Sequence, residues 1–204
     1  MDDQVVLEAP IATTSFSTPV ADVMLWDIES PKVYEVTTQL LYQGQVVDEK
    51  RVTVGFREAL FRKDGFYLNG RKVRIRGLNR HQSYAYVGYA MPESMQRLDA
   101  KILKEELAVN AVRTSHYPQS HYFMDACDRL GLLVFTEMPG WQHIGGQAWQ
   151  DQAVENIKDM IVQYRNHPSI ILWGVRINES QDNDAFYERT NATAHALDDT
   201  RQTG

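Results

Sequence analysis

The sequence lacks most features that would assign it at once to a class of protein. It has a single cysteine, Cys127, in 204 residues, so an intrachain disulfide is excluded and the redox compartment cannot be inferred. No stretch approaches the roughly 18 consecutive apolar residues of a membrane span, so no membrane partner is expected. The first four residues, Met1 to Gln4, are acidic and lack the basic-then-apolar layout of a signal peptide. Localisation is therefore left open.

Positive charge, phosphate-binding loops and metal motifs are also scarce. The chain has 21 Lys and Arg against 27 Asp and Glu, for a net charge of −6, and it has no long basic run, so a nucleic-acid partner is not expected. Gly145 and Gly146 stand alone and follow no predicted strand, which disfavours nucleotide chemistry. His81, His116 and His143 lie in different predicted loops without a His-x-x-x-His spacing. The sequence therefore predicts no dedicated metal site.

The composition is ordinary for a globular protein, 43% hydrophobic and 24% charged. The pattern of apolar and polar residues differs between the first 56 residues and the rest of the chain. Up to about residue 56, short runs rich in Val, Thr, Tyr and Leu (5–7, 32–41 and 46–54) indicate strands, with a hairpin around Gly44. Apolar and polar residues roughly alternate over 33–40, as in a half-buried strand. Residues 1–58 are predicted to be part of an antiparallel β-sandwich, with Trp26 and the tyrosines in its core.

After Gly55, strands alternate with helices. Strands are predicted at 72–77, 111–114, 132–136 and 170–175, and helices at 92–110, 120–130, 149–164 and 183–197. The first helix carries a stripe of Leu98, Ile102, Leu103 and Leu107. Four such units predict a parallel sheet, curled into the first half of an eight-stranded barrel over residues 59–204. A whole barrel needs about 250 residues. Residues 198–204 look like the approach to a fifth strand, and both domains are expected to be incomplete.

Polar side chains follow each predicted barrel strand at the end where barrel active sites are built. Imidazoles, an amide and an indole at one rim suit a sugar, because they offer hydrogen bonds to hydroxyls and a flat face for C–H groups. The set comprises His81, Arg113, His116, Glu137, Trp141, Asn178 and Glu179.

Each of these residues also has a purely structural interpretation. A lone Glu after an apolar strand is usually a loop residue, His81 and His116 could be buried and satisfied, and Arg113 could simply pair with a neighbouring carboxylate. His167, before Pro168, is expected to be a structural turn residue, and Trp173 a core residue. The convergence of four strand ends is what favours the functional interpretation.

The stretch 166–179, ending in Asn178-Glu179, resembles the acid/base segment of family 2 glycoside hydrolases, the group that holds β-galactosidases and β-glucuronidases. Segments 54–57, 66–70, 75–81 and 112–118 extend the resemblance over nearly the whole chain. It implies an immunoglobulin-like sandwich followed by a (β/α)8 TIM barrel. The implied activity is that of a retaining β-glycosidase, and the segment around His116 is closer to the galactosidase and glucuronidase branches than to β-mannosidases.

By the same resemblance, Glu179 is the general acid/base and Asn178 bonds the sugar's 2-hydroxyl. His81 and His116 match residues of the sugar site, and Arg113 matches an arginine that orients the nucleophile. From their places at the rim, Trp141 is also expected to bind substrate and Glu137 to have a supporting role.

Three departures from the family pattern stand out. Gln82 stands where many members carry an acidic residue. Trp141 occupies the position, two residues before His143, that supplies a carboxylate in members with magnesium, so no cofactor is expected. The nucleophilic glutamate of a later barrel strand has no counterpart here. Since retention needs two carboxyl groups, the chain is expected to be an inactive fragment with a carbohydrate substrate.

Two alternatives stay open: a β-glucuronidase fragment, and a non-catalytic carbohydrate-binding or assembly fragment. The sugar and its linkage are not determined by the sequence. Open strand edges and an uncovered apolar face would also make a half-barrel self-associate.

Overall fold

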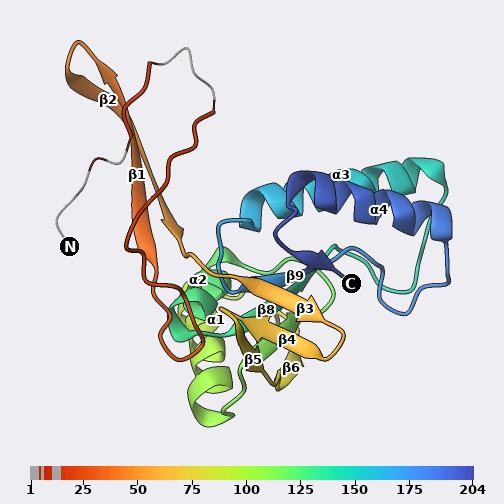
Figure 1. The fold of residues 1–204 in the computed structure, drawn as a ribbon. Coiled ribbons are helices and arrows are strands. Elements are labelled where there is room, and N and C mark those ends of the chain that lie inside the picture. The colour runs from red at the N-terminus through yellow and green to blue at the C-terminus, as the bar shows by residue number, and fades with distance from the viewer. Residues whose placement is uncertain (1–4, 6, 11–14) are drawn as a thin grey trace.

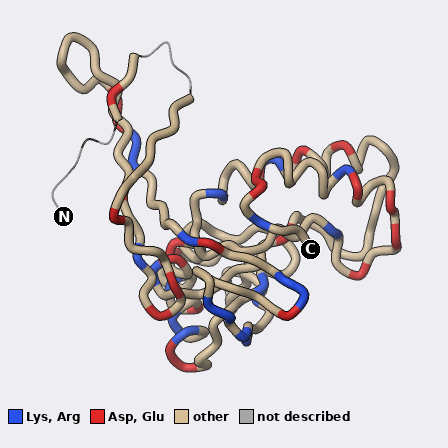
Figure 2. The backbone as a smooth tube through the Cα atoms, in the orientation of Figure 1, with Lys and Arg blue, Asp and Glu red and all other residues tan. Residues whose placement is uncertain are grey.

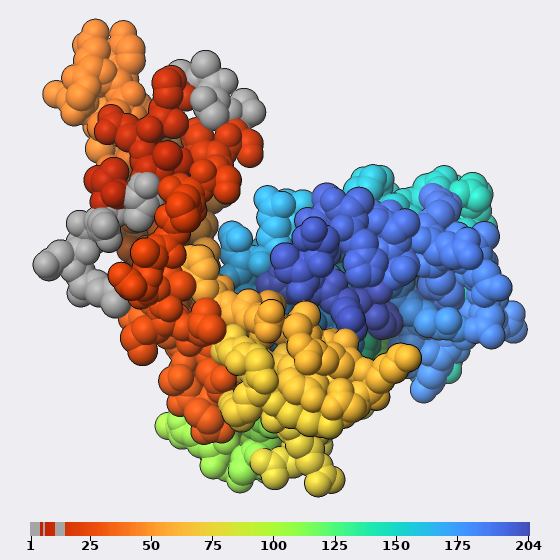
Figure 3. Space-filling view, viewed as in Figure 1, coloured from red at the N-terminus to blue at the C-terminus, as the bar shows by residue number. Residues whose placement is uncertain are grey.

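A computed structural model describes residue 5, residues 7–10 and residues 15–204. Figure 1 shows a long N-terminal hairpin projecting from a body of parallel strands and helices. In the space-filling view this N-terminal arm stands away from the C-terminal helices (Figure 3). Within the described part of the chain, no helix combines the length and apolar character required to cross a membrane.

The hairpin consists of β1 (Tyr34–Tyr42) and β2 (Gln45–Val54), paired antiparallel. Its turn residues Gln43 and Gly44 both have positive φ, 50° and 77°, as tight hairpin turns with the favoured twist require. The predicted hairpin is confirmed, but the predicted half-buried strand is wrong. Most of both strands is exposed, Leu41 by 53% and Val47 by 55%, because no second sheet of the described chain packs against them.

Two further N-terminal predictions fail. Val5 and Leu7 lie outside any strand, and Val6 lies outside the described residues. Trp26 is fully buried, but beneath the barrel sheet rather than in a sandwich core. Its indole Nε1 donates to the carbonyl of Asp128 at 2.7 Å, and the segment before the hairpin is thereby fixed to the barrel. Tyr42 is 66% exposed, so the tyrosines do not share a core either.

A small antiparallel sheet follows, built from β3 (Ala59–Arg62), β4 (Gly65–Leu68) and β5 (Arg71–Val73) (Figure 1). It packs, through Phe66, Leu68 and Val73, into the same cluster as Trp26. The predicted first barrel strand, 72–77, is therefore wrong. Its start belongs to β5, and the chain leaves this sheet before the barrel begins.

The barrel portion is a sheet of β6 (Gly77–Arg80), β7 (Ala111–Thr114), β8 (Leu133–Glu137), β9 (Ile170–Gly174) and β10 (Gln202–Thr203). Spatial order follows chain order and every pairing is parallel, as successive right-handed crossovers require. Gly77 is needed where β6 begins, since a Cβ there would lie 2.7 Å from the Ala111 carbonyl oxygen. The fifth strand, only approached in the sequence, is present as β10.

The helices are α1 (Glu93–Lys101), the π-helix η1 (Ile102–Glu106), α2 (His121–Leu130), α3 (Gln147–Tyr164) and α4 (Asp184–Leu197). Ser120 and Asn183 cap α2 and α4 through their side chains, and Gly131 ends α2 at φ 71°. The predicted helix 92–110 is too long and its stripe is partly wrong. Leu98 lies off the face that buries Gln96, Ala100 and Leu103 and is exposed. Leu107 follows the π turn, which alters the helical periodicity, and is exposed as well.

The main core lies between the sheet and the helices and includes Phe123, Ile157, Trp173 and Phe186, each fully buried. The assignment of Trp173 to the core is confirmed. Lys and Arg are interspersed with Asp and Glu along the backbone (Figure 2). The charge at the rim of the parallel sheet is therefore expected to depend on the side chains that lie there and not on a large region of one sign.

Replacing Leu103 by Ala is expected to lower the free energy of unfolding by about 2–5 kcal/mol, because this 8% exposed side chain packs in the main core. Leu98→Ala, at a 42% exposed position on the preceding helix, is the matched control and should change stability by less than about 0.5 kcal/mol. Urea unfolding followed by circular dichroism measures both. Equal losses would contradict the burial of Leu103 and the exposure of Leu98 described here.

Candidate active site

Arg113 is the centre of a hydrogen-bonded group that joins three strand ends. Its Nε contacts Oε1 of Glu137, and its Nη2 donates to Oδ1 of Asn178 at 2.7 Å. Nδ1 of His116 lies 3.1 Å from Oε2 of Glu137. Glu137 is only 3% exposed, so both of its oxygens find their partners inside the protein. One ion pair thus fixes the positions of His116 and Asn178.

Strand geometry explains why residues so far apart in sequence meet here. Arg113 is the third residue of β7, Glu137 is the last of β8, and Asn178 follows β9. Parallel strands present their C-terminal ends at one edge. An isolated bridge between Trp141 and Asn178 holds the loops after β8 and β9 together.

Glu179 projects from this rim into solvent, from a backbone with positive φ, 57°. Its Oε2 accepts hydrogen bonds from Nε2 of Gln142 and Nε1 of Trp141, each at 3.0 Å. The bonds from Gln142 and then Trp141 lower the pKa of the Glu179 carboxyl, and the charge of nearby His116 contributes in the same direction. As it stands, Glu179 is an ionised acceptor.

Gln142 was not among the residues expected at the site. Its neighbour Trp141 was, and both lie in the loop after β8. In the sequence, only its place beside Trp141 after a predicted strand could have indicated Gln142. That signal is weak, because amide side chains are common in loops. The structure adds Gln142 because its carboxamide and the indole of Trp141, itself 59% exposed, contact the same carboxylate oxygen.

Gln142→Met should raise the pKa of Glu179, because it removes the largest cause of the lowered value while keeping a similar side-chain length. Carbon-detected NMR titration of the Glu179 carboxyl measures the shift directly. Gln147→Met, which removes another carboxamide at the start of α3, is the control and should leave that titration unchanged. A fall or no change in the Gln142 variant would contradict the geometry.

His81 lies beside the hydrogen-bonded group around Arg113 and contacts it through the ring of His116. Its ring centroid lies 5.3 Å from that of His116, edge to face. Next to it, Gln82 has a local structural role. Its Oε1 accepts from the backbone N–H of Ser120 at 2.7 Å, and its own N–H donates to the Tyr117 hydroxyl at 2.9 Å. The Gln82 side chain, at the position where many family members carry an acidic residue, therefore joins two loops.

The expectation that no magnesium binds at this rim stays a prediction. Mg²⁺ prefers oxygen ligands, and Trp141, where the resemblance implies a carboxylate, instead presents an indole N–H that donates to Glu179. The His143 ring lies edge to face against Trp149, with centroids 5.7 Å apart.

The seven expected residues thus form two adjoining groups and one neighbour. Arg113, Glu137, His116 and Asn178 make the first, and Glu179 with Trp141 makes the second, completed by Gln142; His81 borders the first. Arg113 does pair with a neighbouring carboxylate, that of Glu137, as its structural interpretation predicted. The same contact leaves Asn178 and His116 oriented at the rim.

Comparison with known proteins agrees with this architecture. Residues 60–203 match the model of "Glycosyl hydrolases family 2, TIM barrel domain", and residues 2–57 match "Glycosyl hydrolases family 2". A β-galactosidase of Thermoanaerobacterium thermosulfurigenes is 60% identical over 183 residues, covering 90% of this chain and 25% of that protein. A putative β-glucuronidase of Formosa agariphila is 38% identical over 192 residues, covering 88% of this chain and 23% of that protein.

Among solved structures, a β-glucuronidase of Parabacteroides merdae superposes with a TM-score of 0.80 at 35% identity, covering 90% of this chain and 24% of that one. The parallel βα sheet with acidic, amide and aromatic groups at its rim agrees with the TIM-barrel domain of that family model. The chain belongs to glycosyl hydrolases family 2. It spans about a quarter of the length of the relatives it matches.

Proposed function

We propose that this chain carries the acid/base half of the active site of a retaining β-galactosidase. The observation that carries the proposal is the placement of Asn178 and Glu179 in the loop that follows β9, with Asn178 oriented by Arg113. A nucleophilic carboxylate would be supplied from outside these 204 residues. The two carboxyl groups of a retaining site stand about 5–5.5 Å apart.

In this mechanism, Glu179 protonates the leaving glycosidic oxygen and later deprotonates the attacking water. Because Oδ1 of Asn178 accepts from Arg113 at 2.7 Å, its amide N–H groups are left to donate to the sugar's 2-hydroxyl. His81 and His116 contact other hydroxyls, and the exposed indole of Trp141 offers a face to the ring. The lowered pKa of Glu179 must rise for it to act as an acid, and a nearby nucleophile carboxylate would produce that rise.

We also propose that the hairpin β1–β2 belongs to an immunoglobulin-like sandwich, which the family membership favours. Val47 and Leu41 are more than half exposed, as expected for a strand pair whose facing sheet comes from other residues. In this proposal, residues 1–58 belong to the sandwich domain and residues 59–204 to the barrel domain.

A chimaera tests the catalytic proposal. The chain would replace the matching segment of the 60% identical T. thermosulfurigenes β-galactosidase, and nitrophenyl β-galactoside hydrolysis would be measured. Activity is expected to survive. Glu179→Gln in the chimaera should then slow poor leaving groups most and activated aryl groups least, because only the former need protonation. Glu188→Gln, on an exposed face of α4, is the control. Equal activity of both variants would refute the role of Glu179.

The rival within the class is a β-glucuronidase, favoured by the names of the F. agariphila and P. merdae relatives. The higher identity to the galactosidase favours the first proposal. Grafting the same 204 residues into the P. merdae enzyme separates the two, since a galactosidase segment should function better in the galactosidase host. A non-catalytic carbohydrate-binding fragment would restore hydrolysis in neither host.

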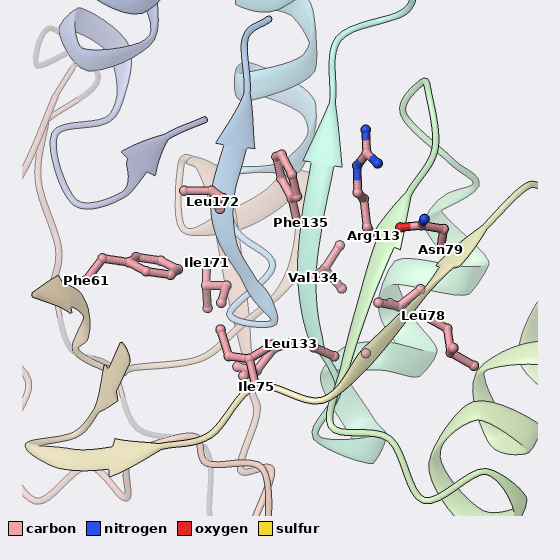
Figure 4. Close-up of a pocket in the computed structure, with 13 residues that line it drawn as sticks. Phe61, Ile75, Leu78, Asn79, Arg113, Leu133, Val134, Phe135, Ile171 and Leu172 are labelled. Atoms are coloured by element: carbon pink, nitrogen blue, oxygen red, sulfur yellow. The ribbon is translucent and has the colours of Figure 1, made fainter. Parts of the chain in front are cut away.

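We further propose that the isolated chain self-associates through the open side of its sheet. A hollow of about 260 Å³ opens over β6 to β9, and its lining includes Leu78, Phe135 and Leu172 (Figure 4). β6 is an edge strand, and Ile75 and Leu78 beside it are 41% and 46% exposed. Unpaired strand edges and apolar patches favour association.

Leu78→Lys is expected to shift the chain toward monomer in sedimentation velocity at micromolar concentration. Val162→Lys, at a 52% exposed position on α3, is the matched control and should leave the association unchanged. A monomeric unmodified chain would contradict the proposal.

A further inference from the structure

A hollow lined by arginines lies at the end of the parallel sheet opposite to the rim. Its volume is about 260 Å³, and its lining includes Arg57, Arg165, Asn166, Pro168, Thr200 and Arg201. The arginines contact Ile170, the first residue of β9, whereas Asn178 and Glu179 follow the other end of that strand. None of the lining residues belongs to the proposed glycosidase site, and no carboxylate lines the hollow within the described part of the chain.

Arg57 has more hydrogen-bond donors than the protein uses. A Cβ on Gly55 would lie 2.6 Å from Cγ of Pro168, so glycine is what lets the end of the hairpin approach this turn. Nε of Arg57 then donates to the Pro168 carbonyl at 2.7 Å, and Nη2 donates to the Ile170 carbonyl at 2.5 Å. A guanidinium has five N–H groups. The other three of Arg57 therefore have no partner among the residues that the structure describes.

A second guanidinium lies beside that of Arg57. Nε of Arg201 donates to the same Ile170 carbonyl at 2.8 Å, so two cations share one oxygen. Arg201 has Asp198 as its counter-charge, whereas Arg57 forms no ion pair with any described residue. Burial, and then the charge of Arg201, lowers the pKa of Arg57 from 12.5 to about 9, and the charges of Asp198 and Asp128 offset this only in part. Negative charge is therefore deficient around Arg57.

Two exposed residues of the turn after α3 supply further donors. The Arg165 carbonyl accepts from Nη2 of Arg201 at 2.9 Å, which fixes the backbone of the turn against the hollow. The side chains of Arg165 and Asn166 are exposed and have no hydrogen-bond or ion-pair partner within the described residues. A long arginine side chain at this position can reach a ligand in the hollow, and the Asn166 carboxamide adds two N–H donors.

We propose that this hollow binds a phosphate-type oxyanion through Arg57, Arg165 and Asn166. Guanidinium groups match the oxygens of such an anion with pairs of hydrogen bonds. Donors from separate segments suit a tetrahedral group, whose oxygens point in several directions and which carries a charge of about −1.5 to −2 at neutral pH, more than a planar carboxylate of charge −1. The anion would link the end of the hairpin to the turn that enters β9. It takes no part in hydrolysis.

Calorimetric titration of the full chain with inorganic phosphate at pH 7.5 tests the site, with ionic strength held constant by sodium chloride and acetate as the comparison anion. One phosphate per chain is expected, together with a melting temperature that rises and saturates, and acetate should bind at least about tenfold more weakly. Arg165→Gln should weaken phosphate binding at least about tenfold, because it removes a charged donor. Arg129→Gln, at an exposed position in the last turn of α2, is the control and should bind as the unmodified chain does.

A carboxylate placed at the hollow should substitute for the ligand. Asn166→Glu is expected to raise the melting temperature without phosphate and to abolish phosphate binding, whereas Gln163→Glu, the same charge change on an exposed face of α3, should do neither. The proposal is overturned if phosphate does not bind, if acetate binds equally well, or if Arg165→Gln binds phosphate unchanged. An unsaturable rise in melting temperature, equal in all variants, would also overturn it, since that is the general effect of an excluded salt.

Discussion

The isolated 204-residue chain is expected to hydrolyse aryl β-galactosides several orders of magnitude more slowly than an ordinary enzyme turning over about 10 times per second. The reason is that a retaining site needs two carboxyl groups, and Glu179 faces solvent with Gln142 and Trp141 as its hydrogen-bond partners. Glu137 cannot serve as the second, because it is 3% exposed and bound on both oxygens by Arg113 and His116.

Release of nitrophenol from nitrophenyl β-galactoside by the purified chain measures this. Turnover within about tenfold of the ordinary value would contradict the expectation. In that event Glu137→Gln should abolish the activity, whereas Glu188→Gln, on an exposed face of α4, should not.

Asp198→Ala is expected to lower the free energy of unfolding at pH 7 by about 3–5 kcal/mol, because it leaves a buried arginine without its counter-charge. Arg201 is 7% exposed, and its Nη1 lies 2.5 Å from Oδ2 of Asp198. The same oxygen accepts from the indole of Trp173 at 2.9 Å. The pair therefore joins the end of α4 and the start of β10 to the core of β9.

The pH dependence of stability provides a second readout for this pair. Burial alone would raise the pKa of Asp198, but the charge of Arg201 and bonds from Thr200, Arg201 and Trp173 lower it from 3.8 to about 2. A carboxyl with a lowered folded-state pKa stabilises the protein above its unfolded pKa and loses this contribution as pH falls through the folded one. The unmodified chain should lose about 2 kcal/mol on this account between about pH 4 and pH 2.

Urea unfolding at pH 7 and across that acid window measures both effects. Asp198→Ala should be less stable at pH 7 and should lack this part of the acid dependence. Asp199→Ala, at the exposed neighbouring position, is the control. If the two variants behave alike, the Asp198–Arg201 pair does not hold β10 in place.

Much of the candidate site was predictable because it follows from local rules. An apolar strand followed by Asn178-Glu179, and other strands followed by His116 or Trp141, place polar groups at one edge of any parallel sheet. That Gln142 and Trp141 bond the same oxygen of Glu179 was not predictable, since it depends on the conformation of a loop. The same holds for Gln82, whose contact with Ser120 joins two separate segments.

The fold errors have the same origin. Residues 72–77 look like one strand because they form one run, but the backbone leaves β5 and enters β6 in different sheets. Leu98 and Leu107 fit a helical stripe in the sequence, but the buried face of α1 contains Gln96 and Ala100 instead of Leu98, and the π turn of η1 precedes Leu107. Trp26 looks like sandwich core by its neighbours in sequence, whereas its indole bonds to Asp128, 102 positions away.

The sequence by itself determined the alternation of strands and helices after residue 110, the hairpin around Gly44, the position of α2, and the family, because these depend on periodicity and on neighbours along the chain. Only the tertiary structure decided which polar groups meet. The ion pair of Arg113 with Glu137 and the contacts of Arg57 and Arg201 with the Ile170 carbonyl each join distant segments. Such contacts arise from the register of parallel strands and the packing of helices on them, and no local sequence pattern encodes either.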